Sequence, residues 1–157
     1  MKASGKNVSN RKKREKDNVS EQTRDIASDL SRLGSFDEIL EYLITYVTQT
    51  LEAERGSLFL HDPAAHQLYT RVALGNLSRE IRIDEQSGIA GWVFMNAEAT
   101  IVNSPYKDER FNKEVDERTG YQTKSIICVP IFSTGDIPIG VLQVLNKKTG
   151  RFTKADP

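Results

Sequence analysis

A short glycine-containing turn is the part of this sequence best suited to hold a ligand. Residues 87–91 read Ser-Gly-Ile-Ala-Gly and lead into an apolar run, so small residues stand where a helix would begin. Free backbone N–H groups and the helix dipole favour an anion at such a position, and missing side chains let a phosphate approach. The same glycines would equally let a helix pack closely on a sheet, so two interpretations stay open.

No catalytic set accompanies this turn. His61 and His66 are the only histidines and flank a turn with Pro63, without a Cys or Ser motif beside them. We therefore expect surface turn residues, not metal ligands or a general base. The acidic pairs at 108–109 and 116–117 lie in polar stretches, where solvated charge is the simpler interpretation. With no acid, base and nucleophile to assemble, the sequence predicts neither an enzyme nor a metal or cofactor site.

Composition limits the compartment and the partners. The single cysteine, Cys128, lies among apolar residues, which predicts a buried core thiol and leaves no internal disulfide. Lys plus Arg and Asp plus Glu both number 22, so no overall charge attracts nucleic acid or an anionic membrane. No apolar stretch approaches the roughly 18 residues of a membrane span, and no signal peptide is evident. We expect a cytoplasmic protein with neither nucleic acid nor membrane as partner.

Two segments precede the main domain. Residues 1–18 are polar and carry a basic run, which predicts a disordered basic leader. Residues 19–34 carry a narrow apolar stripe and predict a linker or dimerisation helix, because the stripe has little else to bury against. The stripe consists of Val19, Ile26, Leu30 and Leu33. We expect a homodimer formed through helices between about residues 19 and 51.

Residues 35–157 read as one α+β domain. Ser35 and Glu38 have the spacing of a capping box and begin an amphipathic helix that reaches Leu51 and closes near Gly56. The apolar period then becomes two, as in strands. Strands are predicted at 57–61, 67–74, 80–83, 100–102, 124–132 and 137–145, and helices at 88–95 and 111–118, with a polar loop at 103–110 between them. These elements predict a central antiparallel sheet of five or six strands with helices on its faces, and residues 153–157 read as the start of a helix cut short.

The order of the motifs resembles that of GAF domains over residues 35–157. More narrowly, it is similar to the regulatory GAF domains of mammalian cyclic-nucleotide phosphodiesterases and of cyanobacterial adenylyl cyclases. The motifs that carry the resemblance are Ile81–Ile83, Ser87–Val93, Ile101–Asn103, Val115–Asp116, Thr119–Thr123, Ser125–Pro130 and Ile139–Lys147. The resemblance implies a GAF-like fold and a regulatory role without catalysis.

A signature of that branch is present in altered form. It consists of an Asn-Lys pair, a spacer, a Phe and, after three residues, Asp-Glu. Here Pro157 stands in place of the Glu, and the other positions are Asn146, Lys147, Phe152 and Asp156. The resemblance implies that Lys147 and Asp156 form a structural ion pair that braces the pocket, without touching the ligand.

The resemblance also implies a set of ligand contacts. Ile89 and Ala90 would hold a cyclic phosphate through their backbone N–H groups. Near the base the chain departs from those relatives, which carry an aromatic or polar residue in the stretch matching Arg71–Leu74; here the planar guanidinium of Arg71 could stack on the base. Leu74 stands where a partner for the base would be expected and offers no hydrogen bond, so the identity of the base stays open. The full set is Ser57, Arg71, Ile89, Ala90, Asp116, Thr119, Thr123 and Gln143.

Two functions from different classes follow. The first is a regulatory domain that binds a cyclic nucleotide, with cAMP the favoured ligand, and controls an adjacent cyclase, phosphodiesterase or kinase domain. The alternative is a GAF domain without a ligand that serves as a dimerisation module in a two-component or cyclase signalling protein. A bilin or haem photosensor is disfavoured, because Cys128 is predicted to be buried and neither histidine has an apolar setting.

Overall fold

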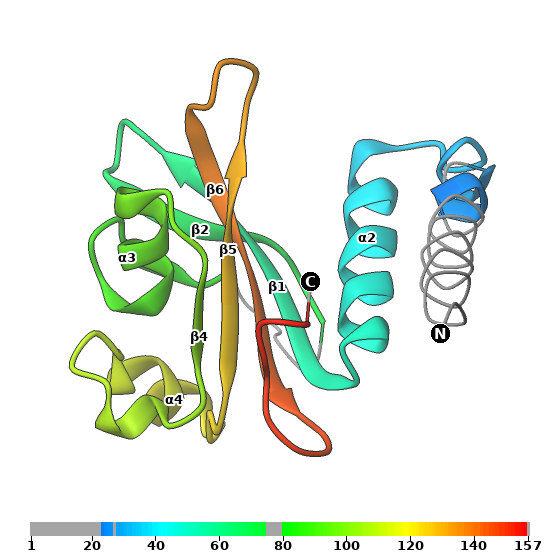
Figure 1. Ribbon diagram of the computed structural model, residues 1–157. Coiled ribbons are helices and arrows are strands. Elements are labelled where there is room, and N and C mark those ends of the chain that lie inside the picture. The colour runs from blue at the N-terminus through cyan, green and yellow to red at the C-terminus, as the bar shows by residue number, and fades with distance from the viewer. Residues whose placement is uncertain (1–22, 27, 75–79, 157) are drawn as a thin grey trace, which may run out of the picture. The chain divides into compact units, whose positions relative to one another are not determined.

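The computed structural model describes residues 23–26, 28–74 and 80–156 (Figure 1). The chain divides into two compact units, Met1–Ile39 and Leu40–Pro157. The basic leader predicted for residues 1–18, together with Val19 and Pro157, lies outside the described residues. No helix among the described residues is long and apolar enough to cross a membrane.

The first unit contains a helical stretch and the start of helix α2 (Phe36–Thr50). Residues 23–26 and 28–30 are helical, and the chain turns at residues 31–32. The predicted capping box is confirmed, since the Glu38 N–H donates to Ser35 Oγ at 3.2 Å and the Ser35 N–H donates to Glu38 Oε2 at 3.1 Å. These two bonds satisfy backbone donors that the first turn of α2 leaves without helical partners.

The end of α2 differs from the prediction. The helix ends at Thr50, Glu52 adopts a left-handed φ of 50°, and a strand begins at Ala53, so the predicted closure near Gly56 is wrong. Gly56 lies within that strand, where an added Cβ would collide with Thr48 Oγ1 and lie 3.0 Å from Ile44 Cγ2. The glycine therefore permits close packing of strand on helix and does not stop the helix.

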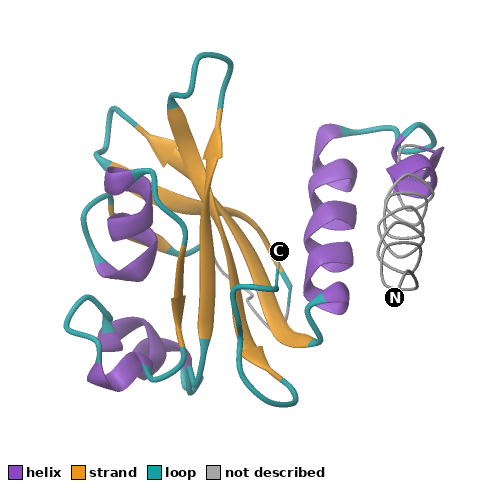
Figure 2. Cartoon of the chain, viewed as in Figure 1, coloured by secondary structure: helices purple, strands orange, loops and turns teal. Residues whose placement is uncertain are grey.

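A six-stranded antiparallel sheet forms the centre of the second unit (Figure 2). The strand order is β3-β2-β1-β6-β5-β4, and every pair of neighbours is antiparallel. The predicted α+β fold is confirmed, including the meander of the first three strands. The strands are β1 (Ala53–Asp62), β2 (Gln67–Ala73), β3 (Arg82–Asp84), β4 (Thr100–Val102), β5 (Ile126–Phe132) and β6 (Pro138–Lys147).

Each face of the sheet buries its own apolar layer. On one face, Ile44 of α2 packs with Leu58 and Val72. On the other face, Val93 of α3 (Gly88–Asn96) packs with Cys128 and its neighbours. Cys128 is fully buried, as predicted, and burial raises the pKa of its thiol.

Two short elements lie between β4 and β5. The predicted polar loop at 103–110 contains a 3-10 turn, η1 (Pro105–Lys107), and the helix predicted at 111–118 is present as α4 (Lys113–Thr119). Asn112 caps α4, because its side-chain oxygen accepts a hydrogen bond from the Glu114 N–H at 3.0 Å. The helix ends at Gly120, whose left-handed φ of 66° is the usual conformation after a helix C-terminus.

Candidate functional site

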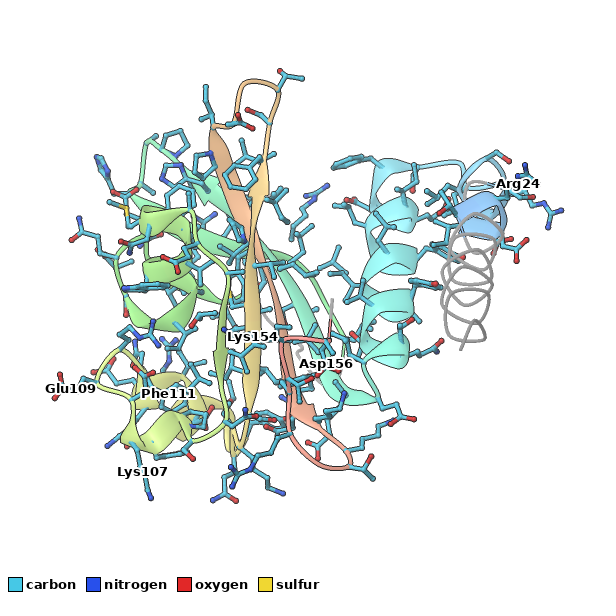
Figure 3. All side chains as sticks on the ribbon, viewed as in Figure 1. Arg24, Lys107, Glu109, Phe111, Lys154 and Asp156 are labelled. Carbon is cyan, nitrogen blue, oxygen red and sulfur yellow. The ribbon has the colours of Figure 1, made fainter. Side chains whose placement is uncertain are left out.

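A cavity of about 70 Å³ lies where α3, α4 and the sheet meet. Five predicted ligand residues line it, namely Ile89, Ala90, Asp116, Thr123 and Gln143. The remaining lining residues are Ile83, Ser87, Gly88, Phe111, Asn112, Val115, Ile126 and Leu145. Phe111 is labelled beside α4 in Figure 3. Most of the lining side chains are thus apolar and come from several helices and strands, while a few polar side chains lie among them.

The first residues of α3 line this cavity. The first hydrogen bond of the helix is donated by the Gly91 N–H to Ser87 O at 3.1 Å, so the N–H groups of Ile89 and Ala90 precede it. Gly88 has a left-handed φ of 71°. A Cβ on Gly91 would lie 2.6 Å from the carbonyl carbon of Gln86. The glycine is therefore needed for close packing of α3 against the turn that precedes it, and not for packing of α3 on the sheet.

Asp116 is the most constrained polar group of the site. Its side chain is buried, and its oxygens accept hydrogen bonds from the Thr123 N–H and the Thr123 hydroxyl, both at 2.7 Å, and from the Tyr106 hydroxyl at 2.8 Å. The bond to Asp116 raises the pKa of Tyr106. Asp116 thereby connects α4 to η1 and to the residues that lead into β5.

Three predicted ligand residues do not line the cavity. Ser57 is buried on β1 opposite Gln143. Arg71 is exposed at the irregularity in β2, where Val72 pairs with Leu58 but Thr70 pairs with Phe59. Thr119 donates its hydroxyl to Val115 O at 2.8 Å, which is the ordinary chemistry of a helix end.

Two further residues support the site, namely Asn112, which lines the cavity, and Tyr106, which bonds to Asp116. Asn112 Nδ2 donates to Ser87 Oγ at 2.9 Å and so joins the start of α4 to the start of α3. An asparagine just before a charged helical run is a recognisable N-cap signal and could have been found. The contact of Tyr106 with Asp116 spans 10 residues and carries no comparable signal.

The signature asparagine holds the residues that follow α4. Asn146 is almost fully buried and has a left-handed φ of 57°. Its Oδ1 accepts from the Lys124 N–H at 2.6 Å and the Ser125 N–H at 3.2 Å. Its Nδ2 donates to Gln122 O at 2.9 Å and to Glu54 Oε2 at 3.0 Å, and the latter bond lowers the pKa of Glu54.

The other signature residues meet as an ion pair over an aromatic ring. Lys147 Nζ lies 2.5 Å from Asp156 Oδ1 and 5.5 Å from the centre of the Phe152 ring. The Thr153 N–H donates to Asp156 Oδ2 at 2.6 Å. The ammonium of Lys147 lowers the pKa of Asp156 (labelled in Figure 3).

The prediction of surface turn positions is wrong for His61. This residue lies in β1 with its side chain 20% exposed, and its ring packs on Phe94 with the centroids 4.4 Å apart. His61 Nε2 lies 2.6 Å from Glu85 Oε2, while the exposed His66 Nδ1 lies 3.1 Å from Glu85 Oε1. Glu85 follows β3 and lies 24 residues from His61 in the sequence. Because the contact is long-range, no sequence pattern predicts it. Within the described part of the chain, no group of three or more His, Cys, Asp or Glu side chains could hold a metal ion.

Comparison with known proteins identifies relatives among cyclic-nucleotide phosphodiesterases. A probable 3',5'-cyclic phosphodiesterase pde-5 of Caenorhabditis elegans is 40% identical over 134 residues, covering 78% of this chain and 18% of the relative. A cGMP-specific 3',5'-cyclic phosphodiesterase of Drosophila pseudoobscura pseudoobscura is 35% identical, and the match covers 83% of this chain and 13% of the relative. A dual 3',5'-cyclic-AMP and -GMP phosphodiesterase 11 of Drosophila melanogaster is 34% identical, and the match covers 90% of this chain and 11% of the relative. The chain thus spans between 11% and 18% of the length of these relatives.

Solved structures share the fold at lower identity. The GAF domain of a phosphoenolpyruvate-protein phosphotransferase from Coxiella burnetii superposes with a TM-score of 0.75 at 17% identity, covering 85% of this chain and 80% of that one. A free methionine-R-sulfoxide reductase from Neisseria meningitidis superposes with a TM-score of 0.69 at 20% identity, and the match covers 83% of this chain and 74% of that one. These likenesses support the fold alone. The family model described as GAF domain matches residues 35–157, and together with the 40% identical relative it shows that this chain belongs to the GAF domain family, as a regulatory domain and not a catalytic one.

Proposed function

We propose that this GAF domain binds a cyclic nucleotide in the cavity between α3, α4 and the sheet, and thereby controls an adjacent output domain. The observation that carries the proposal is the composition of the cavity, which combines the backbone donors of Ile89 and Ala90 with Asp116, Thr123 and Gln143. The relatives are named as cyclic-nucleotide phosphodiesterases. We expect the protein to act in the cytoplasm.

The walls of the cavity suit a singly charged phosphate attached to an apolar ring system. No Lys or Arg is among the lining residues, so an anion would rely on the N–H groups and dipole of α3. Ile83, Phe111 and Leu145 offer apolar surface to a purine. The ligand favoured from the sequence is cAMP, while the names of the relatives include cGMP, so both belong in the test.

The size of the cavity implies that binding is coupled to opening. Ligand pockets usually measure roughly 300 to 1,000 Å³, whereas this cavity measures about 70 Å³. A nucleotide therefore requires α4 or the residues before it to move outward. The hydrogen bonds of Asp116 with Thr123 and Tyr106 hold the present, closed arrangement.

Calorimetric titration of the full chain with cAMP and with cGMP tests the proposal. We expect saturable binding of at least one nucleotide and a higher unfolding temperature in its presence, since a ligand that binds only the native state stabilises it. Gln143→Leu should weaken binding roughly 2- to 12-fold through loss of a polar contact. Gln122→Leu is the matched control, because Gln122 is exposed and does not line the cavity. Absence of binding and of a thermal shift at millimolar nucleotide, in folded protein free of bound nucleotide, would reject the proposal.

The second candidate is a GAF domain that acts as a homodimerisation module without a ligand. The small cavity and the fully engaged carboxylate of Asp116 are the observations that favour it. In that case neither nucleotide binds, while light scattering at high micromolar concentration detects a dimer that is lost when residues 1–34 are removed.

A further inference from the structure

Both ends of one segment over the cavity are hydrogen-bonded to the same stretch of chain. We call residues 103–123 the lid segment, because η1, α4 and the lining residues Phe111 and Thr123 belong to it. We call residues 146–156 the C-terminal segment; it begins with the last two residues of β6 and continues beyond that strand (Figure 1).

The first end of the lid segment is fixed by Asn103. Its Nδ2 donates to Phe152 O at 2.9 Å, and its Oδ1 accepts from the Phe152 N–H at 3.1 Å. One carboxamide thus satisfies both backbone groups of a residue 49 positions away. The Phe152 side chain is itself buried, so residue 152 is held both by its side-chain packing and by the two hydrogen bonds of its backbone with Asn103.

The second end is fixed by Asn146. Its carboxamide holds Gln122 O on one side of Thr123 and the Lys124 N–H on the other, so the backbone of Thr123 is framed by bonds to Asn146. Thr123 in turn donates twice to Asp116 of α4. A continuous series of contacts therefore joins α4 to the start of the C-terminal segment.

The C-terminal segment is held together between these two points. Asn146 is followed by Lys147, which pairs with Asp156, and Asp156 accepts from the Thr153 N–H next to Phe152. The lid segment therefore cannot move outward at either end without straining or breaking contacts of the C-terminal segment.

We propose that Asn103 and Asn146 are positioning residues that couple the lid segment to the C-terminal segment, so that occupancy of the cavity changes the order of residues 152–156. This inference rests on the proposed function for its ligand, although the coupling itself is a property of the ligand-free fold. Coupling between two sites is reciprocal, so loosening the C-terminal segment must also loosen the lid segment.

The first test uses the ligand-free full chain and amide hydrogen exchange followed by NMR. Asp156→Asn removes the ion pair with Lys147 at nearly constant size. We expect it to speed exchange of the lid amides of Lys107, Asp108 and Phe111 by about 5-fold or more, the lower range of typical couplings. Thr149→Ala is the matched control, since Thr149 lies in the same segment and its hydroxyl donates to Glu52, which is outside the lid segment. Unchanged lid exchange, or equally faster exchange throughout β1 and β2, would overturn the proposal.

The second test adds cAMP or cGMP at saturation. Exchange of the Phe152 and Thr153 amides should change by about 5-fold or more in the wild type. In Asn103→Ala the nucleotide should still bind, while this change disappears at the Thr153 amide, whose acceptor Asp156 is retained. Binding without any change at these amides in the wild type would refute the coupling. If neither nucleotide binds, the proposed function fails, and the ligand-free test still decides the coupling.

Discussion

Thr123 donates both its backbone N–H and its hydroxyl to the carboxylate of Asp116, each over 2.7 Å. Both residues are buried and line the cavity. The resemblance to other GAF domains implied that each contacts the ligand, whereas in this structure they contact one another. A ligand that uses either group must therefore compete with a bond already made within the protein.

The first prediction concerns this pair. Asp116→Asn replaces one acceptor oxygen by an NH2 group, which then faces donors of Thr123 or Tyr106. Leaving a buried donor unsatisfied should cost on the order of 1–3 kcal/mol of unfolding free energy. Urea unfolding measures this loss, and Glu117→Gln, at an exposed neighbour on the same helix, should change stability by less than about 0.5 kcal/mol. Equal effects of the two substitutions would contradict the role given to Asp116.

Local patterns were sufficient where the interacting residues are close in sequence. The capping box of Ser35 and Glu38 was predicted because both partners lie within one helical turn. Burial of Cys128 was predicted because its apolar neighbours lie on the same strand. The strands, and with them the α+β fold, were predicted because the apolar pattern of period two is also local to each strand.

Long-range contacts set the limit of such predictions. A glycine after a helical pattern usually marks its end, but Gly56 is required by the approach of Thr48 and Ile44 from α2. The partner of His61 is Glu85, 24 residues away. The bonds of Asn103 span 49 residues, so only the folded sheet brings it to Phe152.

The second prediction concerns the pH dependence of the Lys147–Asp156 pair. The ammonium of Lys147 lowers the pKa of Asp156 in the folded state. At a pH between the folded and the unfolded pKa of Asp156, the carboxyl is therefore protonated in the unfolded chain and ionised in the folded one, so the unfolded chain binds more protons. The stabilisation is therefore present above the unfolded value of about 3.9 and is lost as the pH falls through the folded value. Urea unfolding should show a constant difference between wild type and Asp156→Asn from pH 7 to about 5, and a shrinking difference below about pH 4. A difference that grows on acidification would exclude the pair as its source.

The third prediction tests why residue 56 is a glycine. Gly56→Ala should destabilise the domain by roughly 1–3 kcal/mol, because the new methyl group meets Thr48 Oγ1 and Ile44 at a close contact of helix and strand. Gly34→Ala is the comparison, since its Cβ would meet only Glu38 Oε2 at 3.6 Å. Thr48→Ser removes a methyl group but keeps the colliding oxygen, so it should not rescue Gly56→Ala, whereas Thr48→Ala should restore part of the loss. Full tolerance of Gly56→Ala would show that α2 can move away from β1 without cost.

The last prediction separates backbone conformation from hydrogen bonding at Asn146. This residue combines a left-handed φ of 57° with four hydrogen bonds from its buried carboxamide. Asn146→Gly loses the bonds but keeps the backbone unstrained, whereas Asn146→Ala loses the bonds and places a Cβ in a conformation that costs roughly 1–2 kcal/mol. Both variants should lose stability in urea unfolding, and the alanine variant should be the less stable by about 1 kcal/mol or more. Equal stability of the two would mean that the left-handed backbone at residue 146 is not retained in the variants. A glycine variant as stable as the wild type would mean that the bonds to Gln122, Lys124 and Ser125 do not hold the segment that follows α4.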